Sequence, residues 1–437
     1  MAAVRATLTA WLARQLPGAD GLTLSELKKP SAGVSNETLL AEADWREAGR
    51  AQHERLVVRL MPSASPVFPD YDLGKQVRIL RCLESTNVPV PRVLWFEEDE
   101  RILGSPFYVM PRIEGELPSE VPPYHAFGWC AEISPARQAR MWWSGIETLA
   151  RIHLLNWQRL GLGFLDVDQL DYYEHYLAWG RGETPQPILD ATLAWLKAHR
   201  PKVEHRTLCW GDSRLPNMIF REQETVGVLD WEMAFIGDPE ADLGWWLFMD
   251  WSHSTGYGIP RLPGLPSAAD TVARYEELTQ RQVRNARYWE VFAAYRYGVI
   301  TMKIARALKG AGFPAPDDME TNNSCTQRLA QILDLPPPGR ARAVTDINAV
   351  TARVQFHLTG PGGSDFVIVS DKGEVSLQAG AIADPDTTLT VAAADWLAIQ
   401  TGELNRTDAF LSGKLKIDGD PTLLMQLEGA IAKLTEG

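Results

Sequence analysis

Short apolar and polar alternations characterise residues 1–115 of the 437-residue chain. Arg55–Leu60 is predicted as a strand, and Tyr108–Met110 is expected to end another. Apolar residues recur at helical spacing in Val77–Leu83, which predicts one helix among these strands. The pattern therefore predicts a first lobe made mostly of β-strands.

The pattern becomes helical from residue 116 to about residue 335, and this region is rich in tryptophan. Its clearest long helices are predicted at Met141–Leu155 and Tyr288–Leu308. Most of its tryptophans are expected to lie in the hydrophobic core. A β-rich lobe followed by a helical lobe, residues 116–335, makes a two-lobed unit.

The run Pro336–Gly339 interrupts the helical pattern and predicts a stiff connector at residues 336–345. Only Trp396 of the sixteen tryptophans lies beyond it, so we expect a separate domain at residues 346–437. That domain has an α+β pattern, and the fold class of the whole chain is predicted as α+β. Its predicted elements are strands at Arg353–Leu358, Phe366–Ser370, Val375–Leu377 and Thr387–Val391, a helix at Ala393–Gly402, and a last amphipathic helix after Pro421.

The net charge is −13, from 43 basic and 56 acidic residues, and no local basic patch offsets it. Such a chain repels phosphate backbones and anionic headgroups, so no nucleic-acid partner is expected. No apolar run reaches the length of a membrane span, and the first residues lack the apolar block of a signal peptide. The scattered cysteines match neither a zinc site nor a disulfide framework, so a cytoplasmic protein is expected. They are Cys82, Cys130, Cys209 and Cys325.

The candidate chemistry is concentrated in the segment that ends at Asn217. Phosphoryl transfer needs a carboxylate to orient or deprotonate the attacking hydroxyl, together with oxygen ligands for Mg²⁺. Asp212 and Asn217 have the Asp-x-x-x-x-Asn spacing of the protein-kinase catalytic loop. Between them, Arg214 is placed to reach the transferring phosphate as a second catalytic residue. Asp230 ends an apolar strand at Val226–Leu229, where a second metal ligand is expected. Each residue alone would be an ordinary turn residue, but their joint spacing favours a catalytic site.

Residues 211–217 and 229–244 resemble the aminoglycoside phosphotransferase family, which shares the protein-kinase-like fold with choline kinases. The second stretch is the more distinctive, because Asp-Trp-Glu is followed by Gly-Asp-Pro-Glu-Ala-Asp-Leu-Gly. The resemblance implies a kinase that uses ATP and Mg²⁺ to phosphorylate a hydroxyl group of a small molecule. It also implies roles for the matching residues: Asp212 is the catalytic base, Asn217 and Asp230 are metal ligands, Asp242 braces the catalytic loop and Asp238 is structural.

The same resemblance places nucleotide-binding residues in the first lobe. The segment Pro30–Asn36 is similar to the family's phosphate-covering turn, in which Ser35 and Asn36 would meet the nucleotide. An ordinary hairpin turn is the alternative for this segment. Met110 and Ile113 belong to the stretch that resembles the strand and hinge against which adenine packs.

Three positions depart from the family pattern. Arg59 stands where kinases carry the phosphate-binding Lys, and its expected partner on the following helix is Gln76 instead of Glu. An Arg keeps its charge without a carboxylate, so this pair would still hold the α- and β-phosphates, although a degraded ATP site is the alternative. Trp210 replaces the His of the family's usual His-Gly-Asp.

The C-terminal domain resembles sterol carrier protein type 2 domains over Ala383–Val391 and Phe410–Asp420. The resemblance implies an apolar tunnel for a lipid or acyl ligand, and a filled core that serves a homodimer is the alternative. By fold-level analogy, we expect the phosphate acceptor to be a hydroxylated lipid or acyl compound. An acidic run at residues 166–174 is interpreted as an exposed helix start and not as a lining for polycationic aminoglycosides.

Two other functions stay open at this stage. In the first, the kinase lobes are a catalytically weak nucleotide-binding switch coupled to a lipid-binding carrier domain. In the second, the chain is a scaffold without enzymatic activity, and nucleotide does not change its melting temperature.

Overall fold

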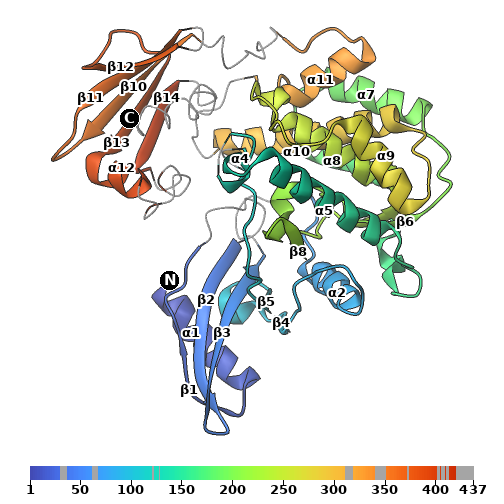
Figure 1. Ribbon diagram of the computed structural model, residues 1–437, viewed down its shortest axis with the longest axis vertical. Coiled ribbons are helices and arrows are strands. Elements are labelled where there is room, and N and C mark those ends of the chain that lie inside the picture. Colours follow the sequence, from blue (N-terminus) through green and yellow to red (C-terminus); the bar gives the residue numbers. More distant parts are fainter. Residues whose placement is uncertain are drawn as a thin grey trace.

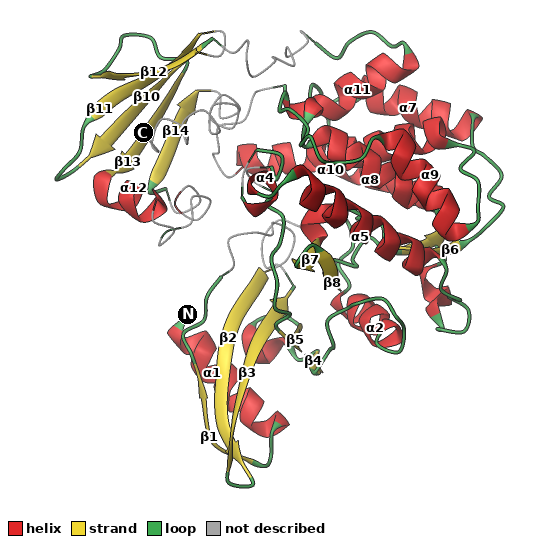
Figure 2. Cartoon of the chain, viewed as in Figure 1, coloured by secondary structure: helices red, strands yellow, loops and turns green. Residues whose placement is uncertain are grey.

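The structure is a computed structural model in which three bodies follow one another along the chain (Figure 1). Strands are concentrated in the first and last bodies, and helices dominate the middle one (Figure 2). The predicted α+β class and two-lobed arrangement are confirmed. The structure describes residues 1–29, 37–61, 67–120, 123–126, 128–310, 318–339, 351–371, 374–400, 404, 409 and 413–419.

The first lobe is an antiparallel sheet of five strands with helices at its edges. The sheet order is β1 (Ala19–Leu24), β2 (Glu37–Glu47), β3 (Arg50–Leu60), β5 (Phe107–Pro111) and β4 (Trp95–Glu97). The helices are α1 (Ala2–Gln15), α2 (Leu73–Leu83) and the short α3 (Glu100–Leu103). One face of the sheet buries Leu56 and Val58 against Leu8, Trp11 and Leu12 of α1.

Helix α2 includes the predicted segment Val77–Leu83 and begins earlier, at Leu73. Asp72 caps it, because its carboxylate accepts a hydrogen bond of 2.8 Å from the backbone N–H of Lys75. Its apolar residues recur every three or four positions, so they form one buried face. This face belongs to the same core as the catalytic hairpin described below.

The helical lobe contains α4 (Trp129–Glu132), α5 (Pro135–His153), α6 (Gln169–Arg181), α7 (Pro187–Ala198), α8 (Glu240–Ser252), α9 (Ala268–Thr279), α10 (Ala286–Gly310) and α11 (Ser324–Leu333). Both predicted long helices are confirmed, as α5 and α10. Helix α10 is central, since it packs against α6, α7, α8 and α11. As expected for core tryptophans, Trp142, Trp245 and Trp246 are almost completely buried.

Two short antiparallel pairs carry the candidate site between these helices. One pair is β6 (Thr207–Cys209) with β9 (Phe235–Gly237), and the other is β7 (Met218–Arg221) with β8 (Glu224–Val228). The predicted strand Val226–Leu229 is confirmed as the end of β8, which stops at Val228, and the Leu229 N–H still bonds to the Asn217 carbonyl at 2.9 Å.

The C-terminal body is a five-stranded sheet with one described helix, α12 (Ala393–Gln400). The strand order is β12 (Glu374–Ala379), β11 (Asp365–Asp371), β10 (Ala352–Thr359), β13 (Thr387–Ala392) and β14 (Leu415–Gly419). The predicted strands are confirmed, and β14 was not predicted. Phe356, Phe366 and Trp396 meet in its core, where the two Phe rings stack at 4.6 Å. The helix predicted after Pro421 lies outside the described residues.

Candidate active site

The segment from Trp210 to Asn217 forms a tight loop between β6 and β7, and a glycine makes it possible. Gly211 has a φ of +90°, and a Cβ at this position would lie 2.0 Å from the Met233 carbonyl oxygen. A side chain at Gly211 is therefore excluded by both the backbone conformation and the lack of space. The loop ends in a short 3-10 turn at Leu215–Asn217.

Asp242 braces this loop from the first turn of α8, as predicted. Its two carboxylate oxygens accept hydrogen bonds from the backbone N–H groups of Trp210 (2.6 Å) and Gly211 (2.8 Å). The same carboxylate lies 3.1 Å from His153 Nε2, and His153 Nδ1 lies 2.6 Å from the Tyr275 hydroxyl. A buried network of side chains from α5, α8 and α9 thus sets the position of the loop.

The side chain of Asp212 is held by donors on both oxygens. Trp245 donates its indole N–H to Oδ1 at 2.8 Å, and Oδ2 accepts from Asn217 Nδ2 at 2.7 Å. Arg214 donates its Nε–H to Oδ2 at 3.0 Å. Asp212 is only 7% exposed, so its carboxylate lies in a largely desolvated place. The three donors hold it in one orientation, and a general base must be held in position.

Arg214 lies between two carboxylates. It forms an ion pair with Glu120 in addition to the one with Asp212. Burial by itself lowers the pKa of Arg214, but the charges of Asp212 and Glu120 outweigh this effect and raise the pKa well above its ordinary value. The predicted role of Arg214 at the transferring phosphate stays a prediction, because here its charge is balanced by protein groups. The sequence did not point to Glu120.

Asn217 and Asp230, the predicted metal ligands, are brought together by the backbone bond from Leu229 to Asn217. The amide nitrogen of Asn217 donates to Asp212, which leaves its carbonyl oxygen for another partner. Asp230 is a non-glycine residue with a φ of +57°, and its buried Oδ1 has no hydrogen-bond partner among the residues that the structure describes. Burial also raises the pKa of Asp230. A carboxylate oxygen and an amide oxygen on these two adjoining segments are the kinds of ligand that a hard divalent cation such as Mg²⁺ prefers.

Trp210 connects the catalytic loop to the segment that carries Asp230. Its indole N–H donates to the carbonyl oxygens of Leu229 (2.8 Å) and Asp230 (3.1 Å). At the position where the family usually has His, this chain therefore has an indole that binds the two segments together. No pattern in the sequence signals this contact, because the donor and its acceptors are about twenty residues apart.

Arg59 contacts Asp230 and not Gln76. Its Nη2 lies 3.8 Å from Asp230 Oδ2, and its Nη1 is 3.5 Å from Thr38 Oγ1. Burial lowers the pKa of Arg59, but the nearby Tyr108 and Asp230 outweigh it, so the pKa is raised. Gln76 is buried on α2, and no hydrogen bond joins it to Arg59 in the described part of the chain.

Beside Gln76, Lys75 was missed from the sequence. Its Nζ donates to the Glu232 carbonyl at 3.4 Å, and burial lowers its pKa. A second partly desolvated cation therefore lies on α2, close to the Asp-Trp-Glu segment.

The predicted hinge residues lie where the two lobes join. Met110 is buried near the end of β5, and Ile113 packs over β8, since a Cβ at Gly227 would lie 3.1 Å from its Cδ1. Glu116 then pairs with Phe220 of β7 through backbone hydrogen bonds. The hinge is therefore attached directly to the catalytic hairpin. Ser35 and Asn36 lie outside the described residues, so their nucleotide contacts stay a prediction.

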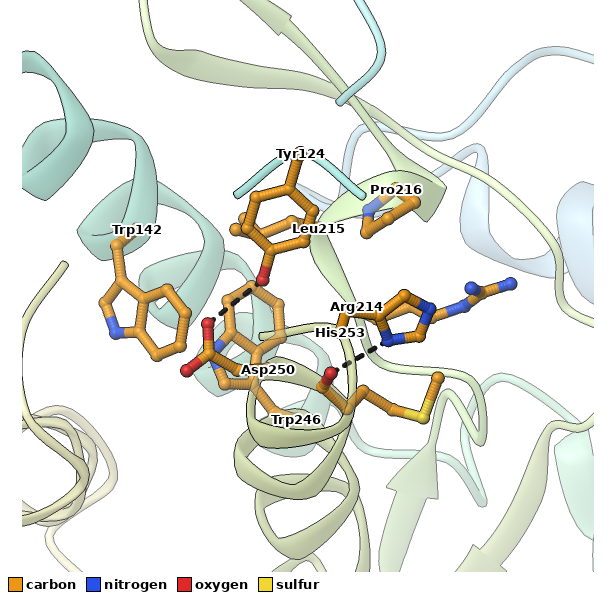
Figure 3. Close-up of a pocket in the computed structure, with 9 residues that line it drawn as sticks. Tyr124, Trp142, Arg214, Leu215, Pro216, Trp246, Asp250 and His253 are labelled. Atoms are coloured by element: carbon orange, nitrogen blue, oxygen red, sulfur yellow. Dashed lines mark hydrogen bonds between the residues drawn. The ribbon is translucent and has the colours of Figure 1, made fainter. Parts of the chain in front are cut away.

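A cavity of about 10 Å³ adjoins the loop beside Arg214 (Figure 3). Its polar wall is Asp250, whose carboxylate accepts from the Tyr124 hydroxyl (3.0 Å) and from Arg261 (2.6 Å). Burial raises the pKa of Asp250, but His125 and Arg261 outweigh it and lower the pKa. This volume suits one water molecule, so the cavity is not itself a place for an acceptor.

The acidic run at residues 166–174 begins a helix, as predicted. Asp168 caps α6 by accepting from the backbone N–H groups of Leu170 (3.0 Å) and Asp171 (3.2 Å). It also forms an ion pair with Arg200. The carboxylate of Asp168 is therefore already partnered by groups of the protein itself.

A five-stranded lobe, a helical lobe and a braced Asp-x-x-x-x-Asn loop between them define a protein-kinase-like phosphotransferase fold. Residues 26–289 match the model of the Phosphotransferase enzyme family, so the chain belongs to this family. Residues 329–432 match the model of the SCP-2 sterol transfer family, which agrees with the resemblance seen in the C-terminal domain.

A solved structure agrees with this fold, and the chain is also similar to parts of longer curated proteins. A crystal structure from Ralstonia eutropha, described as an aminoglycoside phosphotransferase, has a TM-score of 0.56 at 24% identity and covers 75% of this chain and 95% of that chain. Acyl-CoA dehydrogenase family member 10 of Mus musculus is 31% identical over 204 residues, and family member 11 of Homo sapiens is 27% identical over 267 residues. These two matches cover 45% and 56% of this chain, but only 18% and 32% of those longer proteins.

Within the described ranges, no helix combines the length and the apolar character needed to cross a membrane.

Proposed function

We propose that this phosphotransferase transfers the γ-phosphoryl group of ATP to a hydroxyl group of a small molecule. The observation that carries the proposal is the geometry of Asp212. Its carboxylate is oriented by Trp245, Asn217 and Arg214, on a loop that lies directly beside the unpartnered oxygen of Asp230.

In this proposal the Asp212 carboxylate orients the attacking hydroxyl group and accepts its proton. The donors on its two oxygens hold the carboxylate in one orientation, which removes the need for reorganisation during the reaction. Asn217 and Asp230 would hold Mg²⁺, which when bound neutralises charge on the β- and γ-phosphates. Arg59, with Lys75 nearby, supplies positive charge on the first-lobe side of the site.

For the acceptor we propose a hydroxylated lipid or acyl compound. Two observations support this class over a polycationic sugar. The acidic run at residues 166–174 is used for helix capping and ion pairs, and the chain carries a domain of the SCP-2 sterol transfer family. The longer relatives are named acyl-CoA dehydrogenase family members, which supports the same chemical class.

The test is mass spectrometry of a panel of hydroxylated metabolites and lipids incubated with the protein and Mg-ATP, with Asp212→Ala as the comparison. We expect ATP-dependent addition of phosphate and a kcat lowered by about 10²- to 10⁴-fold in the variant. Asp171→Ala removes an exposed carboxylate from α6 and is the matched control. Equal turnover by wild type and Asp212→Ala would contradict the proposal.

A second function is favoured by one specific contact. Glu120 forms an ion pair with Arg214 and so competes with the transferring phosphate for the guanidinium group. The alternative function is therefore a weakly active nucleotide-binding switch that reports to the carrier domain. It predicts that Mg-ATP stabilises the fold while no acceptor in the panel is phosphorylated. Phosphorylation of any acceptor, lost in Asp212→Ala, would reject it.

We also propose the cytoplasm as the compartment, and domain limits at residues 1–115, 116–335 and 346–437 with a connector at residues 336–345. Limited proteolysis checks the limits, since we expect cleavage between folded domains before cleavage within them.

A further inference from the structure

Arg296 on α10 is a completely buried cation without a carboxylate partner among the described residues. Its Nη2 donates to the carbonyl oxygen of Gly211 at 2.8 Å. Its Nε and Nη1 have no hydrogen-bond partner at normal distance within the described ranges, and the guanidinium also interacts there with the Tyr173 hydroxyl. Arginine stays protonated in proteins, so the helix places an unneutralised positive charge beneath the catalytic loop.

Four aromatic rings surround this guanidinium group. Its Cζ lies 4.4 Å from the ring centre of Trp245 and 5.1 Å from that of Tyr173. Phe292 and Phe235 follow at 5.7 and 5.8 Å. Such contacts offset part of the cost of burying a charge, but a buried cation without an anion remains unfavourable for the fold. A position of this kind is therefore a candidate for a functional role.

Both strong contacts of Arg296 lead to Asp212. Gly211, whose carbonyl accepts from Arg296, directly precedes Asp212 in the loop. Trp245 presents its ring face to Arg296 and donates its indole N–H to Asp212 Oδ1 at 2.8 Å. A cation over the face of an indole also makes its N–H a stronger donor, because the positive charge draws electron density from the ring.

We propose that Arg296 is a positioning residue for the phosphotransfer reaction. It fixes the Gly211 carbonyl and, through Trp245, supports the negative charge of the Asp212 carboxylate. This inference rests on the proposed function, because it takes Asp212 as the base. Arg296 does not touch the reacting atoms, so its effect is expected on kcat and not on the binding of ATP.

The same helix offers a matched control in Arg306. This residue is also buried in part, but its guanidinium donates to the carbonyl oxygens of Gly180 and Arg181, both at 2.6 Å, and pairs with Glu320. Arg306 thus closes the C-terminal end of α6, and within the described ranges its guanidinium group has no hydrogen bond to the catalytic loop. Its loss should affect stability alone.

The first experiment compares Arg296→Met with Arg306→Met in turnover and in Mg-ATP binding by calorimetry. We expect Arg296→Met to lower kcat by about 10²-fold while the KM and Kd for ATP change less than about threefold. Arg306→Met should lower the melting temperature and leave kcat near the wild-type value. Equal kcat in the two variants, or a change confined to ATP affinity, would overturn the proposal.

A double-mutant cycle with Trp245→Phe separates positioning from general damage. The Phe ring keeps the aromatic face but removes the N–H donor to Asp212. If Arg296 acts through Trp245, the loss of kcat in the double variant is smaller than the product of the two single losses. A loss of kcat in the double variant that equals the product of the two single losses would show that Arg296 does not act through Trp245. Should Arg296→Met fail to fold, Arg296→Lys, which keeps the charge, replaces it in the cycle, with partial kcat expected.

The outcomes also distinguish this inference from the proposed function. If Asp212→Ala turns over like the wild type, the proposed function fails. If Asp212→Ala is inactive while Arg296→Met keeps the wild-type kcat, only the role of Arg296 is rejected.

Discussion

The catalytic loop and the segment that carries Asp230 lie side by side but differ in how their polar groups are partnered. On the loop, both oxygens of Asp212 and the backbone N–H groups of Trp210 and Gly211 have hydrogen-bond partners within the protein. On the other side, Asp230 Oδ1 and Arg59 Nε are buried without any partner in the described ranges.

The catalytic loop is therefore the preorganised side of the site, and the Asp230 segment is the side that a ligand completes. Buried polar groups are normally paired, and an unpaired one costs about 1–3 kcal/mol. The base is therefore built into the apo fold, whereas the Asp230 side keeps an unsatisfied oxygen that a cation would satisfy. The four predictions below test this contrast.

The largest effect on stability is expected from Asp242→Ala, on the preorganised side. Two backbone donors and His153 lose their acceptor inside the protein, at about 1–3 kcal/mol for each buried group left unpaired. We expect the free energy of unfolding to fall by about 3 kcal/mol or more, measured by urea denaturation. Asp171→Ala should stay within about 0.5 kcal/mol of wild type. A similar small loss in Asp242→Ala would show that the brace does not stabilise the loop.

Next, Asp230→Asn tests the side that a ligand completes. Wild type should gain about 2.7 kcal/mol of stability when Mg-ATP is present at a hundred times its Kd. The variant should lose most of this gain, because an amide oxygen is a weaker ligand for a hard cation than a carboxylate. Without nucleotide we expect its stability to change by less than about 1 kcal/mol. The melting temperatures of both proteins are measured with Mg-ATP, with ATP plus a chelator, and with neither. A shift with Mg-ATP that is as large in the variant as in the wild type would contradict the metal site.

A pH dependence is expected from Asp238, which follows β9 and precedes α8. Burial raises the pKa of Asp238 from 3.8 to about 6. The folded state therefore binds the proton more tightly than the unfolded chain. The stability from this group is fully present below about pH 4 and is lost as the pH rises through about 6. We expect a contribution on the order of 2 kcal/mol.

Asp238→Asn is the variant to compare with wild type. The Glu240 N–H lies 3.0 Å from Asp238 Oδ1, and an amide oxygen can accept the same hydrogen bond without titrating. Melting temperatures of both proteins between pH 4 and pH 7 should converge at low pH and diverge as the pH rises, with the variant more stable above pH 6. Parallel curves would mean that Asp238 titrates near its ordinary pKa.

The smallest effect concerns the link between the two sides. Trp210→Phe removes the N–H that bonds to the Leu229 and Asp230 carbonyls and should cost about 1–2 kcal/mol. Trp246→Phe is a matched control, since the buried Trp246 Nε1 has no partner in the described part of the chain. The difference between the two variants in urea denaturation isolates the hydrogen bonds. No difference would mean that Trp210 contributes only its ring.

Local patterns in the sequence predicted the helices and strands around the site. Val77–Leu83 and Tyr288–Leu308 were found as helices because apolar spacing reports a buried face. Strand β14 and the early start of α2 were missed, since a short strand depends on its neighbour and a helix start depends on its cap.

The sequence by itself determined which residues belong to the catalytic loop, because a tight turn and a fixed spacing are properties of neighbouring residues. Asp212, Asn217 and Asp230 are therefore recognisable in the chain. Only the tertiary structure decided what surrounds them. Glu120 pairs with Arg214 across 94 positions, and Arg296 reaches Gly211 across 85. The first contact arises because the segment that precedes α4 lies against the loop, and the second because α10 packs beneath it. No local pattern records which distant side chains the packing will bring together.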